Sequence, residues 1–136
     1  MLTNPSTIDS NQNGVDDGLE DFDEDGLSNA QEIAFGTDPY LSDTDGDQLS
    51  DLFEVSFDGD SNNYSVTDLN PLDSDSDGDG LDDNVEVEIA GLDPLLSSDA
   101  AIDSDLDGLT NAEEALFGSS LSSADTEAEG DSDIIE

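Results

Sequence analysis

The sequence of 136 residues contains no lysine, arginine, histidine, cysteine or tryptophan. Without histidine, cysteine or lysine, the chain has no Ser-His or Cys-His nucleophile pair, no Schiff base and no zinc site of the usual ligand types. Without positive side chains it would repel nucleic acid, and an anionic membrane except through a bridging cation. The lack of cysteine rules out a disulfide framework. These absences argue against an enzyme and against nucleic acid as a partner.

Long apolar runs are also missing. No stretch approaches the roughly 20 apolar residues that span a bilayer, so we expect no transmembrane segment. Residues 1–8 lack the basic start and the apolar stretch of a signal peptide. If the protein is exported, we expect its signal to lie upstream of this chain.

Acidic side chains dominate what is present. The chain has 39 aspartates and glutamates and a formal charge of −39, which opposes a compact state. Hydrophobic residues make up 32%, below the roughly 45–50% of a globular domain. Composition alone would favour disorder, unless bound cations supply the missing folding energy.

The stretch DSDGDGLDDNVE at residues 75–86 has a spacing that indicates such a cation. Acidic side chains fall at positions 1, 3, 5, 9 and 12, and glycine falls at position 6. This is the spacing of the twelve-residue calcium loop of the EF-hand type, in which alternate side chains and a backbone carbonyl supply hard oxygens. The predicted ligands are Asp75, Asp77, Asp79, the Leu81 carbonyl, Asp83 and Glu86.

Four further stretches repeat this spacing, and a weaker sixth stretch lies at residues 125–136. The loop at 9–20 has two neutral amides, so we expect weaker binding there. The loop at 43–54 has Gln48 instead of glycine at position 6, so we expect a distorted bend. The predicted ligands are Asp9, Asn11, Asn13, Val15, Asp17 and Glu20; Asp21, Asp23, Asp25, Leu27, Asn29 and Glu32; Asp43, Asp45, Asp47, Leu49, Asp51 and Glu54; Asp103, Asp105, Asp107, Leu109, Asn111 and Glu114; and Asp125, Glu127, Glu129, Asp133 and Glu136.

A short helix is predicted to begin in the second half of most loops. Position 8 is always a good N-cap residue, namely Asp16, Ser28, Ser50, Asp82, Thr110 and Ser132. Glycines at 36, 91 and 118 are expected to end helices of about two turns. Two helical faces are predicted to form small cores beside the ions: Leu81, Val85 and Ile89, and Leu109, Ala112 and Leu116.

The links between loops carry weaker signals. An Asx-Pro pair precedes three loops, at 4–5, 38–39 and 70–71, and its Asn4, Asp38 or Asn70 side chain either adds an oxygen to an ion or sets a turn. The longest link, residues 55–72, is expected to be an ordered loop or a short hairpin. Asp58, Asp68 and Asp99 lie outside the loops, and we expect them to be surface charge.

Two stretches in combination, GLEDFDEDGLSNAQEIAFGTDPYLSDTDGDQLSD and DSDSDGDGLDDNVEVEIAGLDP, resemble the thrombospondin type 3 repeat in its cysteine-free bacterial form. The resemblance covers roughly residues 3–136. It implies an extracellular, calcium-loaded, elongated array with little regular secondary structure, used as a stalk or spacer in secreted or surface proteins. Dockerin modules are also similar, but they typically carry two loops.

We therefore expect one small, irregular, calcium-stabilised array over residues 1–136, in which calcium loops lead into short α-helices with little or no β-sheet. The leading hypothesis is a structural calcium-binding region of an extracellular or cell-surface protein, with about five or six ions. The alternative is a calcium-dependent binding or self-assembly module, whose partner is a copy of itself or another surface protein. A piece cut from a longer array would also explain where the chain begins and ends. A solvated acidic domain would explain the charge but not the glycine and glutamate spacing.

Overall fold

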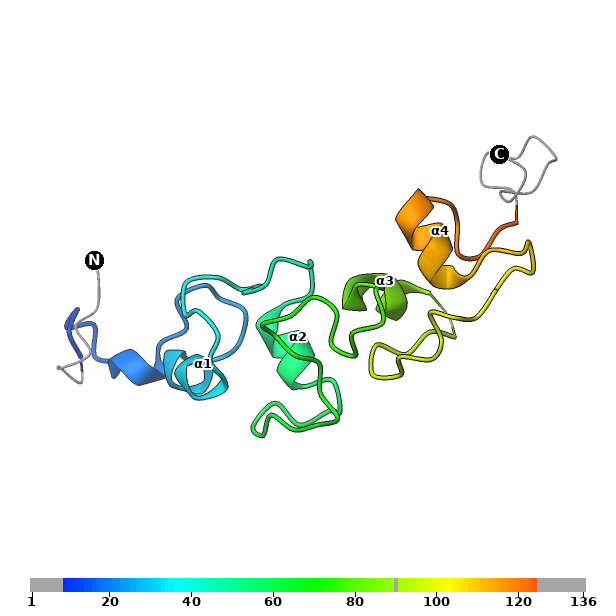
Figure 1. Ribbon diagram of the computed structural model, residues 1–136. Coiled ribbons are helices and arrows are strands. Elements are labelled where there is room, and N and C mark those ends of the chain that lie inside the picture. The colour runs from blue at the N-terminus through cyan, green and yellow to red at the C-terminus, as the bar shows by residue number, and fades with distance from the viewer. Residues whose placement is uncertain (1–8, 90, 125–136) are drawn as a thin grey trace. The chain divides into compact units, whose positions relative to one another are not determined.

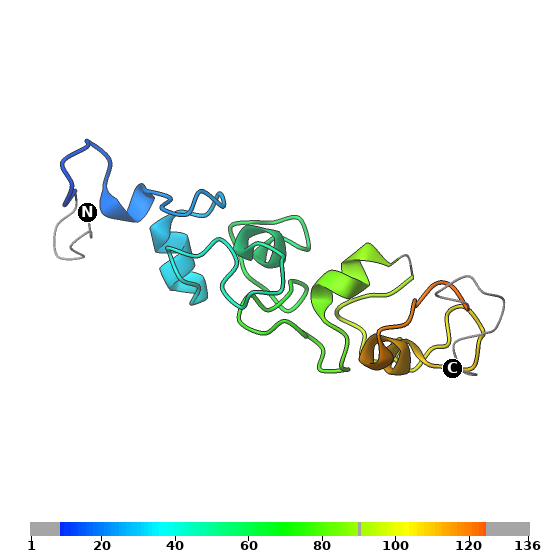
Figure 2. The same ribbon diagram turned by 90° about the horizontal axis from the view of Figure 1, so that it is seen from above.

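The computed structural model describes residues 9–89 and 91–124, so the predicted loop at 125–136 lies outside the described residues. Short helical elements are separated by irregular chain (Figures 1 and 2). They are the 3₁₀-helix η1 (Asp17–Leu19) and the α-helices α1 (Asn29–Phe35), α2 (Asp51–Val55), α3 (Asp83–Glu88) and α4 (Asn111–Phe117). The described residues contain no extended strand, as the loop spacing predicts.

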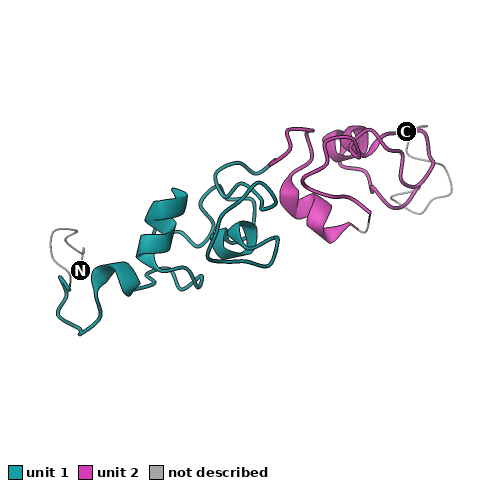
Figure 3. Ribbon diagram, turned by 90° about the horizontal axis from the view of Figure 1, so that it is seen from below, with its two compact units in different colours: residues 1–74 teal, residues 75–136 magenta. Residues whose placement is uncertain are grey.

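The chain divides into two compact units, residues 1–74 and residues 75–136 (Figure 3). The first unit contains η1, α1 and α2, and the second contains α3 and α4. Each of these elements begins within a predicted calcium loop, so every unit is built from loop and helix pairs.

Each of the five described loops is held by hydrogen bonds from its own backbone to its own side chains. The Oδ2 atom of the position-1 aspartate accepts the N–H of position 6 over 3.0–3.1 Å in all five loops. The Oδ1 atom of position 5 accepts the N–H of position 7 over 2.7–2.9 Å. Short Asp and Asn side chains readily form such local bonds, so the spacing itself shapes the turn.

Two backbone positions in each of the five described loops are left-handed. Position 6 has φ between 87° and 108°, and position 4 has φ between 60° and 87°. Gln48 adopts φ 87° and its N–H donates to Asp43 Oδ2 over 3.0 Å, as the glycines at this position do. The prediction of a distorted bend at Gln48 is therefore wrong. The loop keeps its bend, at the cost of backbone strain at this residue. The left-handed position 4 carries no consistent residue type, which is why the spacing did not reveal it.

Position 8 is the N-cap of all five helical elements, as predicted. Capping boxes join Thr110 to Glu113 and Ser28 to Gln31, which satisfies backbone N–H groups at both helix starts. Left-handed glycines at 36 and 118 end α1 and α4. Helix α3 instead ends at Glu88, before Gly91, so the predicted stop at Gly91 is wrong.

Buried apolar side chains are few. Among the described residues they are Leu27, Val55, Leu69, Leu81, Ala100 and Leu121. In the second unit, Val85 and Ile89 pack against a cluster of Leu81, Ala100 and Leu121, which confirms one predicted face. On the second predicted face, Ala112 also packs against this cluster, but Leu116 is 79% exposed, so the prediction is wrong for Leu116. The short helices therefore do not enclose a conventional core.

We predict that Gln48→Gly stabilises the calcium-loaded protein. Glycine adopts the left-handed conformation without the steric penalty of a side chain, so the free energy of unfolding should rise by about 0.5–1 kcal/mol after the larger unfolded-state entropy of glycine is subtracted. Thermal unfolding in saturating calcium measures the change. Gln48→Ala is the control, because it removes the same amide but keeps the strain. Equal stability of the Gly and Ala variants would contradict the prediction.

Candidate functional site

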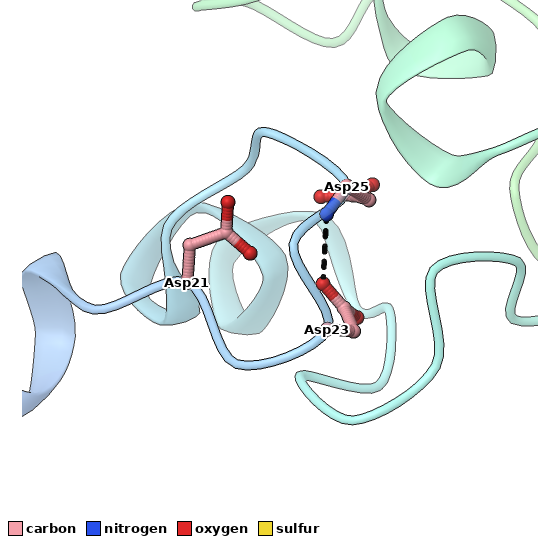
Figure 4. Close-up of side chains that lie close together, drawn as sticks. All are labelled: Asp21, Asp23 and Asp25. Atoms are coloured by element: carbon pink, nitrogen blue, oxygen red, sulfur yellow. Dashed lines mark hydrogen bonds between the residues drawn. The ribbon is translucent and has the colours of Figure 1, made fainter.

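Carboxylates gather at the start of four loops. One oxygen from each of the residues at positions 1, 3 and 5 lies within 4.8 Å of the others, a spacing that allows one ion to contact all three. The four clusters are Asp21, Asp23 and Asp25; Asp43, Asp45 and Asp47; Asp75, Asp77 and Asp79; and Asp103, Asp105 and Asp107. In the loop shown in Figure 4, the Asp21 carboxylate points toward the segment that carries Asp23 and Asp25.

The glutamate at position 12 of each of these loops lies in the helix that begins within the loop. Glu32, Glu54, Glu86 and Glu114 are each at most 1% exposed. Neither carboxylate oxygen of Glu32 or Glu86 has a hydrogen-bond partner. Burial, reinforced by neighbouring aspartate charges, raises the pKa of both side chains to about 8. A buried carboxylate without a partner is costly, so each needs a proton or a cation.

The aspartate at position 3 shows a similar pattern. One oxygen of Asp23, Asp45 and Asp77 accepts the N–H of position 5, while the other is buried without a hydrogen-bond partner. Burial raises the pKa of Asp45 and Asp77 to about 6. The turn thus fixes each carboxylate through one oxygen and leaves the second for another ligand.

These oxygens suit a hard divalent cation. The chain has no Lys, Arg or His side chain that could neutralise a buried carboxylate. The donor set consists of oxygen alone, which favours calcium or magnesium over softer metals. A mainly carboxylate loop with a bidentate glutamate at its end fits the larger coordination number of calcium.

The side chain at position 9 forms hydrogen bonds of two different kinds, depending on whether it is aspartate or asparagine. Asp51 and Asp83 accept hydrogen bonds from both the N–H and the hydroxyl of position 2, as in the 2.8 Å and 2.7 Å bonds from Thr44 to Asp51. Asn29 and Asn111 instead donate their side-chain amides to backbone carbonyls of upstream residues. Direct contact of position 9 with an ion stays a prediction.

The loop at 9–20 differs from the others in its amides. The Oδ1 atoms of Asn11 and Asn13 take the backbone bonds that aspartate Oδ1 takes elsewhere. Their Nδ2 groups then donate to Glu20 Oε1, with a distance of 2.7 Å from Asn11. In this loop, Glu20 Oε1 therefore accepts hydrogen bonds from within the loop. The other described loops have aspartates, which cannot donate, at the same two positions.

Two aspartates outside the loops are buried, so the expectation of surface charge is wrong for them. Asp68 is 5% exposed and accepts the N–H groups of Asp58 and Ser65, which orders the 55–72 link. Asp99 is 2% exposed and places an oxygen within 4.8 Å of oxygens from Asp79 and Glu86. No motif spacing marks either residue, so only their burial reveals them.

Asp38, from one Asx-Pro pair, takes part in a turn. Its Oδ1 accepts the Tyr40 N–H over 3.2 Å, and its carbonyl accepts the Leu41 N–H over 2.8 Å. These bonds favour the turn interpretation at this pair. Asn4, in another pair, lies outside the described residues.

The family model of the bacterial TSP3 repeat matches residues 21–40 and 75–97. These two segments, one in each unit, are therefore similar to the bacterial TSP3 repeat, which confirms the predicted resemblance there. The match implies a calcium-binding repeat, in agreement with the carboxylate clusters of the same segments. Searches of curated proteins and of solved structures gave no match. No helix in the described parts of the chain is long and apolar enough to cross a membrane.

We predict that the calcium-free protein gains helix as the pH falls from 8 to 5. The folded-state pKa of Glu32 and Glu86 is raised to about 8, above the ordinary value, so the folded state binds more protons over this range. Stability is then greatest near the unfolded-state pKa and is lost as the pH rises toward 8. Far-ultraviolet circular dichroism of chelated protein measures this, with sedimentation to exclude aggregation. A helix signal that falls on acidification would contradict it.

We predict that the double variant Asn11→Asp, Asn13→Asp strengthens calcium binding by the loop at 9–20. The two substitutions replace the Nδ2 donors that face Glu20 with carboxylate oxygens, and greater ligand charge raises calcium affinity. Backbone amide shifts of residues 9–20 during a calcium titration should show a midpoint at roughly tenfold lower calcium. Residues 103–114 in the same sample are the internal control. An unchanged midpoint at 9–20 would show that the amides do not limit binding.

Proposed function

We propose that this chain is a structural region of an extracellular or cell-surface protein, in which calcium stiffens a stalk or spacer. Calcium is its folding cofactor, with about five or six ions bound along the loops. The ions replace the salt bridges that the sequence cannot form, because it has 39 acidic side chains and no Lys, Arg or His.

One observation carries this proposal. The carboxylates of the position-12 glutamates Glu32 and Glu86 are buried without hydrogen-bond partners, and neighbouring aspartate charges act on both. The same helix that buries the glutamate is capped inside the loop, so ordering the loop and ordering the helix are one event. A cation that binds this arrangement stabilises the fold by its full binding free energy.

A structural role fits the rest of the described surface. The carboxylates that lie close together are those of the loops and of Asp99, and they are the groups expected to hold cations. This favours a scaffold over a catalyst. An exported location is supported by the type of repeat, because repeats of the TSP3 kind typically occur in extracellular proteins.

A second candidate function is calcium-dependent self-assembly or binding to another surface protein. Several large apolar side chains are well exposed, and they would gain from being covered. They include Leu19 (70%), Ile33 (71%), Leu106 (84%), Leu116 (79%) and Phe117 (69%). Because these side chains belong to several different elements of two separate units, this is the weaker candidate.

We predict that chelated protein is expanded and that calcium folds it. Circular dichroism should show helix appearing with millimolar calcium, and small-angle scattering should show the chain becoming more compact, because the ions remove carboxylate repulsion. Equilibrium dialysis should count about five or six ions. Magnesium is the matched control, because it is smaller and prefers an octahedral site that these loops fit poorly.

If neither signal responds to calcium, the structural role is excluded and the chain is a solvated acidic segment. Sedimentation velocity in calcium separates the two candidate functions. A monomer at all protein concentrations supports the spacer, whereas calcium-dependent association supports assembly.

A further inference from the structure

Asp99 is a buried carboxylate outside the twelve-residue loops. It follows the matched repeat, which ends at residue 97, and precedes the loop that begins at Asp103. Its side chain is 2% exposed. Its Oδ2 atom accepts the Asp93 N–H over 2.8 Å, while its Oδ1 atom is buried without a hydrogen-bond partner.

The Asp99 carboxylate belongs to a group of three carboxylates that lie close together. Asp79, Glu86 and Asp99 each place one oxygen within 4.8 Å of the other two. Glu86 is 1% exposed and also lacks a hydrogen-bond partner. Three carboxylates at this spacing repel strongly unless a cation lies among them.

The first unit contains a similar hydrogen bond to a position-5 aspartate, and comparing the two sites shows how Asp99 differs from Asp51. The Leu52 N–H donates to Asp25 Oδ2 over 3.0 Å, and the Ala100 N–H donates to Asp79 Oδ2 over 3.3 Å. In both cases the residue before the donor is a buried aspartate, Asp51 or Asp99. Both carboxylate oxygens of Asp51 accept hydrogen bonds from Thr44, whereas Asp99 keeps one oxygen without a hydrogen bond.

On the basis of the calcium-binding function proposed above, we propose that Asp79, Glu86 and Asp99 bind one calcium ion, with Asp99 as a ligand from outside the loop. The ion then ties residues 93–100 to the loop at 75–86. Asp93 and Asp99 are joined by their hydrogen bond, so the turn between them is ordered with the ion.

This ligand also connects two loops within the second unit. The Asp99 carbonyl accepts the Asn111 side-chain amide over 2.9 Å, at the start of α4. The next residue, Ala100, belongs to the apolar cluster with Leu81 and Leu121. An ion held by Asp99 therefore orders the link that positions the helix of the following loop.

The test is a calcium titration of the full chain, labelled with ¹³C and ¹⁵N and followed by nuclear magnetic resonance. In the wild type, the Asp99 carboxyl carbon should shift in step with those of Asp79 and Glu86. Asp99→Asn keeps an acceptor for the Asp93 N–H but loses the charge, so the amides of residues 75–86 should need roughly tenfold more calcium. Asp68→Asn is the matched control, a buried aspartate outside the loops, and should leave this midpoint within about twofold.

An Asp99 carboxyl carbon that stays unmoved while Asp79 and Glu86 titrate would overturn the inference, and so would an unchanged midpoint in Asp99→Asn. The wild-type carboxyl shift decides the question even if Asp99→Asn fails to fold, and Asp99→Glu, which restores a carboxylate, should recover most of the affinity. In both outcomes that overturn the inference, the amides of residues 75–86 still respond to calcium, so the proposed function stands. If no wild-type resonance responds to calcium, the proposed function itself has failed.

Discussion

The structure depends on one constraint, the burial of carboxylates in a chain that has no Lys, Arg or His side chain. The side chains of Glu32 and Glu86 are buried, and neither carboxylate has a hydrogen-bond partner among the described residues. Burying such groups is unfavourable unless a proton or a cation compensates. The fold is therefore coupled to a ligand, because its polar centres oppose folding until that ligand is bound.

The local geometry arranges the donor oxygens within each loop. Hydrogen bonds from the backbone fix one oxygen of the position-3 aspartates Asp23, Asp45 and Asp77. The N-cap at position 8 begins the helix that contains the glutamate of position 12. Part of the ordering entropy is thus offset by bonds within a dozen residues. The small apolar clusters then attach the helix to the chain that follows. Because hydrogen bonds order each loop and apolar contacts only attach its helix, a few buried apolar side chains are enough for this fold.

The loops are variations of one design. The pair Asn11 and Asn13 replaces two carboxylates with amides that bond to Glu20, so that loop closes partly by hydrogen bonds. Gln48 keeps the left-handed bend without glycine. Such differences give each loop its own balance between internal hydrogen bonds and oxygens left for a cation.

The sequence alone determined the loops, because ligand spacing, the position-8 caps and the glycine bend act over at most twelve neighbouring residues. It also determined the oxygen donor set and the absence of compensating cations. Tertiary structure decided what spacing does not encode: the burial of Asp68 and Asp99, the exposure of Leu116, and the end of α3 before Gly91. These features depend on contacts between residues far apart in the chain. The carboxylate of Asp99 reaches Glu86 only because the intervening turn folds back on the loop.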